Sequence, residues 1–249
     1  MRIVSSAWGM HESAWRDFGR GATCKKMTYD CSKVSWTLMQ ARVKWPRSTC
    51  GEVRMELSHI RSHERGESVL FEKDLSEVYA EARETMLATQ VKLAPDRAEN
   101  RPWAIREDVL RHFAERGWEI GASIFPASAP AMFQRGNYRL DAIRRTGRGT
   151  ALGFICHFGS SEFLVRQLML ISEAVRRGIA DCAILALMTG GFKRHVAGRT
   201  SCYEQARRLL HAYGQSAFHG VPMVLWGLTP DSTQSGLADA RVGLRARVQ

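Results

Sequence analysis

The sequence predicts an α/β fold in which a central mixed sheet is flanked by helices. Three short apolar runs, typical of buried strands, lie at residues 151–158, 179–189 and 221–228. Apolar residues at helical spacing separate these runs, at residues 163–175 and 203–213. The order strand–strand–helix–strand–helix–strand in the second half indicates one mixed sheet with helices packed against it. We expect a single domain over residues 1–249.

The first half is expected to supply helices that pack on this sheet. Residues 1–50 are irregular and basic, and residues 2–4 could form a short strand. Residues 51–90 look helical, with an apolar stripe from Leu75 to Leu87. Residues 93–101 contain Pro95 and charged side chains, which is typical of a linker. Residues 103–117 form an amphipathic pattern that Gly117 ends.

The central stretch, residues 137–177, carries the candidate chemistry. Apolar and polar residues alternate from Tyr138 to Ala142, which predicts a half-buried strand. Residues 144–149 are polar and contain glycine, so a turn is expected before the strand at 151–158. Asp141 stands in the first strand, His157 lies near the end of the second, and Glu162 begins the following helix.

Beyond this stretch, Gly178 is expected to end the central helix, and residues 179–189 form an apolar strand. Residues 190–200 form a flexible basic loop, after which Ser201 can cap a helix. The last strand, at 221–228, has Pro222 near its start, where a proline is tolerated.

The composition constrains the partners. The formal net charge is +11, from 36 Lys and Arg against 25 Asp and Glu. That balance suits a polyanion such as DNA, although a basic protein without such a partner has the same charge.

The six cysteines form no CxxC pair, no apolar run is long enough for a membrane span, and the first residues lack a signal core. We therefore expect a cytoplasmic protein with no membrane partner. No phosphate-binding or dinucleotide motif is present, so no nucleotide cofactor is expected.

Asp141 fits the first acid of a PD-(D/E)xK nuclease core. Phosphodiester hydrolysis commonly uses a divalent metal to activate water and to stabilise developing charge. Magnesium takes oxygen ligands, usually one or two carboxylates together with substrate phosphate. Two neighbouring strands can each supply an acid at one sheet edge. A polar group two residues after the second acid then lies on the same face.

Several segments resemble the BglII/BstYI family of type II restriction endonucleases. They are HFAERGWE at 112–119, Asp141, HFGSSEFLV at 157–165, SCYEQARRLL at 201–210 and VPMVLWGLTP at 221–230. The likeness covers residues 103–230, the expected nuclease core. It implies a PD-(D/E)xK restriction-endonuclease-like fold, one or two Mg²⁺ ions per site, double-stranded DNA as substrate and a homodimer, since a two-fold protein matches a palindromic site.

The sequence departs from this family at the metal site. Aligned on Phe158-Gly159, the family's glutamate falls on Ile155 and its glutamine falls on His157. Three explanations stay open. Glu162 could supply the second metal-binding acid from the helix, Glu119 could complete the site, or the site could be inactive. Glu162 also suits a helix N-terminus for electrostatic reasons alone.

Two basic segments are candidate DNA contacts. The family resemblance implies that the loop after the third strand reads bases, here through Lys193, Arg194, His195, Arg199, Thr200 and Ser201. Alternatively, this loop makes phosphate contacts only. In the expected turn, Arg144, Arg145 and Arg148 would position phosphates.

The expected function is therefore that of a type II restriction endonuclease, cleaving DNA at a short palindromic site. Asp141 and a second acid would hold the magnesium, and His157 would lie beside the attacking water. The alternative is a catalytically inactive DNA-binding protein with a decayed nuclease core.

Overall fold

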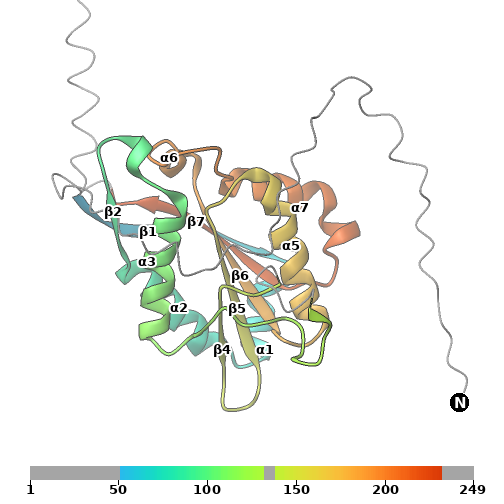
Figure 1. Ribbon diagram of the computed structural model, residues 1–249. Helices are drawn as coiled ribbons and strands as arrows, with labels where there is room; N and C mark the ends of the chain where they lie inside the picture. Colours follow the sequence, from blue (N-terminus) through green and yellow to red (C-terminus); the bar gives the residue numbers. More distant parts are fainter. Residues whose placement is uncertain (1–50, 132–137, 232–249) are drawn as a thin grey trace, which may run out of the picture. The chain divides into compact units, whose positions relative to one another are not determined.

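A seven-stranded mixed sheet forms the centre of the molecule (Figure 1). The computed structural model describes residues 51–131 and 138–231. Across the sheet the strand order is β2-β1-β7-β6-β5-β4-β3. The strands are β1 (Gly51–His63), β2 (Gln90–Leu93), β3 (Glu119–Ile120), β4 (Ala142–Arg145), β5 (Ala151–His157), β6 (Cys182–Met188) and β7 (Met223–Pro230).

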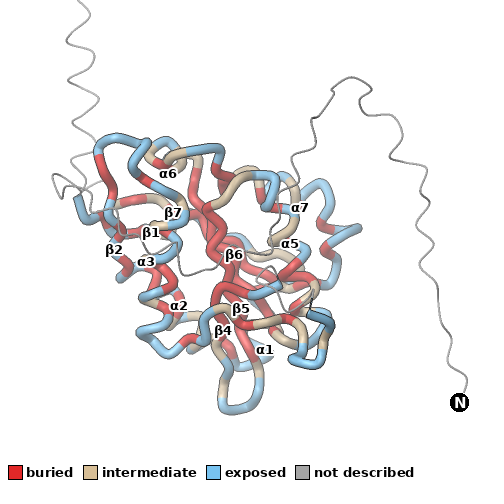
Figure 2. The backbone as a smooth tube through the Cα atoms, viewed as in Figure 1, coloured by how far each residue is buried: buried red, intermediate tan, exposed pale blue. Residues whose placement is uncertain are grey.

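The three central strands β5, β6 and β7 are parallel, and the other neighbours pair antiparallel. Parallel neighbours need crossover connections, which helices provide here as they do in other α/β proteins. The central strands are buried along almost their whole length and consist mainly of apolar residues, since both faces of the sheet are covered (Figure 2). The prediction of a central mixed sheet flanked by helices is confirmed.

Two helical layers cover the sheet. On one face lie α1 (Gly66–Glu72), α2 (Ser76–Ala88) and α3 (Pro102–Glu115), whose apolar residues pack with those of β4 to β7 in one core cluster. On the other face lie α5 (Ser161–Arg176) and α7 (Tyr203–Ala217), which form a second cluster with the sheet. The short helix α6 (Gly190–Lys193) and a 3-10 turn at Arg97–Glu99 complete the elements. No helix within the described ranges has the length and apolarity to cross a membrane.

The helical prediction for residues 51–90 is wrong in its first part. Residues 51–63 form β1, which pairs antiparallel with β2 and along most of its length with β7. Val53 and Met55 are buried, and the charged residues next to them are exposed, which is the alternation of a strand. Pairing with β7, far away in the sequence, decides the conformation of this charged segment.

The first central strand is also displaced from its predicted position. The alternation predicted a strand from Tyr138 to Ala142, whereas β4 begins at Ala142 and continues through Arg145. The turn is consequently shorter, because Arg145 already pairs with Ala151. Gly149 adopts a φ of 84° in this turn, a conformation that glycine adopts without strain. Asp141 therefore lies just before β4.

Two boundary predictions need smaller corrections. Helix α7 has Cys202, not Ser201, at its N-cap, and the Gln205 side chain accepts a hydrogen bond from the Cys202 N–H group. The expected linker at 93–101 contains the end of β2 and the 3-10 turn. The predictions for residues 1–50 concern a segment outside the described residues.

Candidate functional site

An open cavity of about 340 Å³ lies beyond the C-terminal end of β5. In α/β sheets this edge of the parallel strands is the usual place for ligands. Four parts of the chain meet there: the first two turns of α3, the segment just before β4, the end of β5, and the beginning of α5. The lining residues are Pro102, Trp103, Arg106, Asp141, Cys156, His157, Phe158, Gly159, Phe163 and Gln167.

Both carboxylate oxygens of Asp141 have partners. Arg106 donates from Nη2 to Oδ1 at 2.6 Å and from Nε to Oδ2 at 3.3 Å. The backbone N–H of Cys156 donates to Oδ2 at 2.7 Å. Asp141 is buried, and its charge is compensated by a guanidinium fork that fits the carboxylate in two places. Although burial by itself lowers it, the hydrogen bond and charge of Asp141 raise the pKa of Arg106 above its ordinary value.

His157 shares the cavity with Asp141, as the sequence predicted. It ends β5 and is only 5 % exposed. Its Nε2 lies 3.2 Å from the carbonyl oxygen of Ser160. Burial lowers the pKa of His157 and outweighs the opposing effects of the Ser160 carbonyl and Asp141. A lowered pKa favours the neutral imidazole.

The donor set of this cavity does not fit a magnesium ion. Asp141 is its single carboxylate, and that carboxylate is already bound by Arg106. Ile155 is fully buried in the core cluster beneath α5 and α7. Among the described residues, no group of three or more His, Cys, Asp or Glu side chains is arranged to hold a metal.

The two candidate replacement acids lie outside the cavity lining. Glu162 is exposed in the first turn of α5, and from that helix Phe163 and Gln167 face the cavity instead. Glu119 is exposed on β3, where its backbone pairs with Ile143. Neither glutamate lines the cavity that contains Asp141.

The loop between β6 and α7, residues 189–201, is fixed at the rim of the cavity. On one side, Ser201 donates from its backbone N–H and its hydroxyl to the Gly159 carbonyl oxygen, at 2.8 and 3.1 Å. On the other side, the Asn100 side chain donates to the His195 carbonyl at 2.7 Å, and Arg97 donates to the Val196 carbonyl at 2.9 Å. The segment is therefore anchored through its backbone, and its first residues form α6 rather than a loop.

The predicted DNA contacts of this loop fall into two groups, one exposed and one buried. Arg194 and Arg199 are exposed, and Lys193 and His195 are partly exposed. Thr200 and Ser201 are buried, with exposed fractions of 2 % and 0 %. Their expected role in DNA contact needs correction, because buried hydroxyls cannot reach a duplex. Ser201 instead ties the loop to Gly159.

The other predicted DNA contacts lie far from the cavity. The turn before β5 and His157 at its end are separated by the length of the strand, roughly 20 Å. Arg144 donates to the Gly117 carbonyl and lies 3.7 Å from a Glu81 carboxylate oxygen, and Arg148 forms an ion pair with Asp74. Arg145 is exposed. The structure therefore does not bring this turn together with the basic loop.

Sequence reasoning missed Arg106, Gln167 and Asn100. Arg106 lies on the polar side of α3, and its pairing with Asp141 spans 35 residues of sequence. Gln167 was assigned to the apolar stripe of its helix because of its spacing. Its amide gives the cavity a polar group. The sequence signal for this role is a polar residue within an otherwise apolar stripe of the helix. Asn100 lies in the segment assigned to a linker.

Comparison with known proteins finds structural similarity at low sequence identity. Neither a protein-family model nor a curated protein matches the sequence. Among solved structures, restriction endonuclease BglII complexed with a DNA 16-mer has a TM-score of 0.48 at 13% identity, covering 70% of this chain and 75% of that chain. Free BglII has a TM-score of 0.44 at 17% identity, covering 72% of this chain and 80% of that chain.

Proposed function

We propose that this protein binds double-stranded DNA through a restriction-endonuclease-like core and does not cleave it. The observation that carries this proposal is the pairing of Asp141 with Arg106 in a cavity without a second carboxylate. A metal-dependent nuclease needs oxygen ligands free for the ion. The net charge of +11 and the exposed arginines of the anchored loop support binding to a polyanion.

Two assays on the same preparation test this proposal. A gel shift at low salt should detect binding to a DNA duplex, and plasmid digestion with magnesium or manganese should leave the plasmid intact. Cleavage at either metal would overturn the assignment as a non-cleaving protein. The absence of a gel shift at low salt would overturn DNA binding altogether.

A metal-dependent type II restriction endonuclease, acting in the cytoplasm on a short palindromic site, is the second candidate. Its supporting observation is that Asp141 and His157 line one cavity, at the end of an antiparallel strand pair followed by a helix and a parallel strand. This candidate requires Arg106 to release Asp141 and a glutamate to approach. Cleavage that disappears in Asp141→Ala and Glu162→Ala, while DNA binding is retained, would support it. Full activity of Glu162→Ala would leave Glu119 as the candidate second acid.

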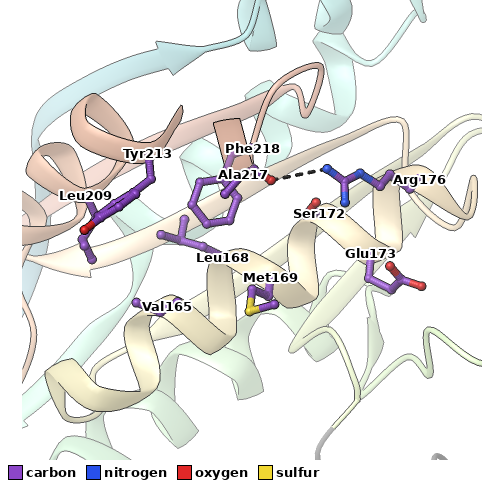
Figure 3. Close-up of a pocket in the computed structure, with 10 residues that line it drawn as sticks. All are labelled: Val165, Leu168, Met169, Ser172, Glu173, Arg176, Leu209, Tyr213, Ala217 and Phe218. Atoms are coloured by element: carbon purple, nitrogen blue, oxygen red, sulfur yellow. Dashed lines mark hydrogen bonds between the residues drawn. The ribbon is translucent and has the colours of Figure 1, made fainter. Parts of the chain in front are cut away.

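We also propose that the protein forms a homodimer through α5 and α7. An apolar groove of about 440 Å³ lies between these helices (Figure 3). Val165, Met169 and Tyr213 line it and are 44 %, 61 % and 56 % exposed. The groove also presents Glu173, which pairs with Arg177, and Arg176, which donates to the Ala217 carbonyl oxygen; a two-fold interface can bring these opposite charges together. Sedimentation velocity over a range of concentrations tests this assembly.

A further inference from the structure

The guanidinium of Arg106 binds Asp141 on one side and faces the open cavity on the other. Its Nε and Nη2 donate to Asp141, and among the described residues Nη1 has no hydrogen-bond partner. The side chain is 44% exposed, whereas that of Asp141 is 11% exposed. The cation therefore covers a carboxylate on one side and reaches the open cavity on the other.

The charges in the cavity show how the position of Arg106 affects the approach of a DNA phosphate. Asp141 is its one acid, Arg106 is its one permanent cation, and the remaining lining residues carry no permanent charge. An uncompensated carboxylate would repel an approaching phosphate. Metal-dependent nucleases neutralise such a carboxylate with a divalent ion, but here the guanidinium is already in contact with both oxygens.

We propose that Arg106 replaces the divalent cation as the charge that allows a DNA phosphate into this cavity. The inference rests on the proposed DNA binding and adds that this binding is independent of metal. Arginine suits the role because its rigid fork can hold a carboxylate while another N–H donates to a phosphate oxygen. Since the arginine belongs to the chain, the compensation is permanent.

The consequence is that removing Arg106 should create a metal requirement. In Arg106→Gln, the Asp141 carboxylate loses its compensating charge and is freed from the arginine, so that it can share with a DNA phosphate the oxygen coordination of a magnesium ion. Loss of one charged hydrogen-bond donor should weaken binding about tenfold in EDTA. Magnesium should restore part of that loss in the variant and should not improve the binding of the wild-type protein.

Arg111→Gln is the matched control. Arg111 lies on the same helix and also pairs with an aspartate, Asp108, but it does not line the cavity. The charge change is identical, so a general electrostatic effect should appear equally in both variants. We expect Arg111→Gln to bind equally well in EDTA and in magnesium.

The experiment measures fluorescence anisotropy of a labelled DNA duplex of mixed sequence, in EDTA and in magnesium, with a gel confirming that the duplex stays intact. Wild-type binding that requires magnesium would overturn the inference, as would Arg106→Gln binding in EDTA as well as Arg111→Gln. If Arg106→Gln does not fold, Arg106→Lys carries the test, since it keeps the charge and should bind in EDTA. A requirement for magnesium in Arg106→Lys overturns the inference. Absence of binding by every protein in both buffers would instead refute the proposed function.

Discussion

Breaking the contact between Arg106 and Asp141 should destabilise the protein measurably. Two charge-assisted hydrogen bonds join the pair, one at 2.6 Å and one at 3.3 Å. A hydrogen bond to a charged group contributes about 1.5–3 kcal/mol when well formed. Because the Arg106 side chain is 44% exposed, solvent screening reduces this value. We expect a coupling free energy of about 1.5 kcal/mol for the two side chains.

A double-mutant cycle with Arg106→Met and Asp141→Asn measures this coupling by urea unfolding at fixed protein concentration. The single variant Arg106→Met should cost about 2 kcal/mol, because it leaves a buried carboxylate without its counterion. That cost corresponds to a fall in Tm of roughly 4–8 °C for a domain of this size. The pair Arg111–Asp108, spaced i,i+3 on α3, should show a coupling of at most about 0.5 kcal/mol. A coupling for Arg106 and Asp141 no larger than that of this control pair would refute the reasoning.

Three further variants test other parts of the structure. His157 has a folded-state pKa below its ordinary value of 6.5, so the unfolded chain binds the proton more readily. The neutral His157 side chain therefore contributes to the free energy of unfolding above pH 6.5, and this contribution is lost as the pH falls through the folded-state pKa. His157→Gln should flatten the pH dependence of stability in that range. An unchanged pH dependence would contradict this prediction. Gly66→Ala should cost about 1–3 kcal/mol in urea unfolding, since its Cβ would lie 2.7 Å from the Met223 carbonyl carbon, and a neutral effect would contradict the packing of α1 on β7. Met169→Asp should shift the sedimentation profile from dimer to monomer, and an unchanged profile would rule out the groove between α5 and α7 as the interface.

The elements that were predicted well are those with a strong local signal. The runs that became β5, β6 and β7 are almost wholly apolar, and α3 and α5 show one apolar face each. These patterns depend on neighbours within the same segment. The strand β1 was missed because its charged sequence resembles a solvated helix, and its conformation depends on pairing with β7.

The site was predicted only in part, because local spacing is visible in the sequence whereas contacts between distant segments are not. Asp141 and His157 were found from the spacing of a two-strand motif, and the structure brings both into one cavity. The partner of Asp141 was not predictable from spacing. Arg106 lies on the polar side of α3, where an arginine at this position looks like any solvated residue. Only the packing of α3 against the sheet reveals what it contacts.

The way in which the loop at 189–201 is anchored has a consequence for how its proposed DNA contacts can change. Its backbone is fastened to Gly159 and Asn100, while Arg194 and Arg199 extend into solvent and contribute nothing to this fastening. Exposed side chains that carry no structural contact tolerate substitution with little loss of stability. Variation at these two positions can therefore change the proposed DNA contacts while the scaffold stays intact. If the loop binds DNA as proposed, those contacts can be changed one side chain at a time.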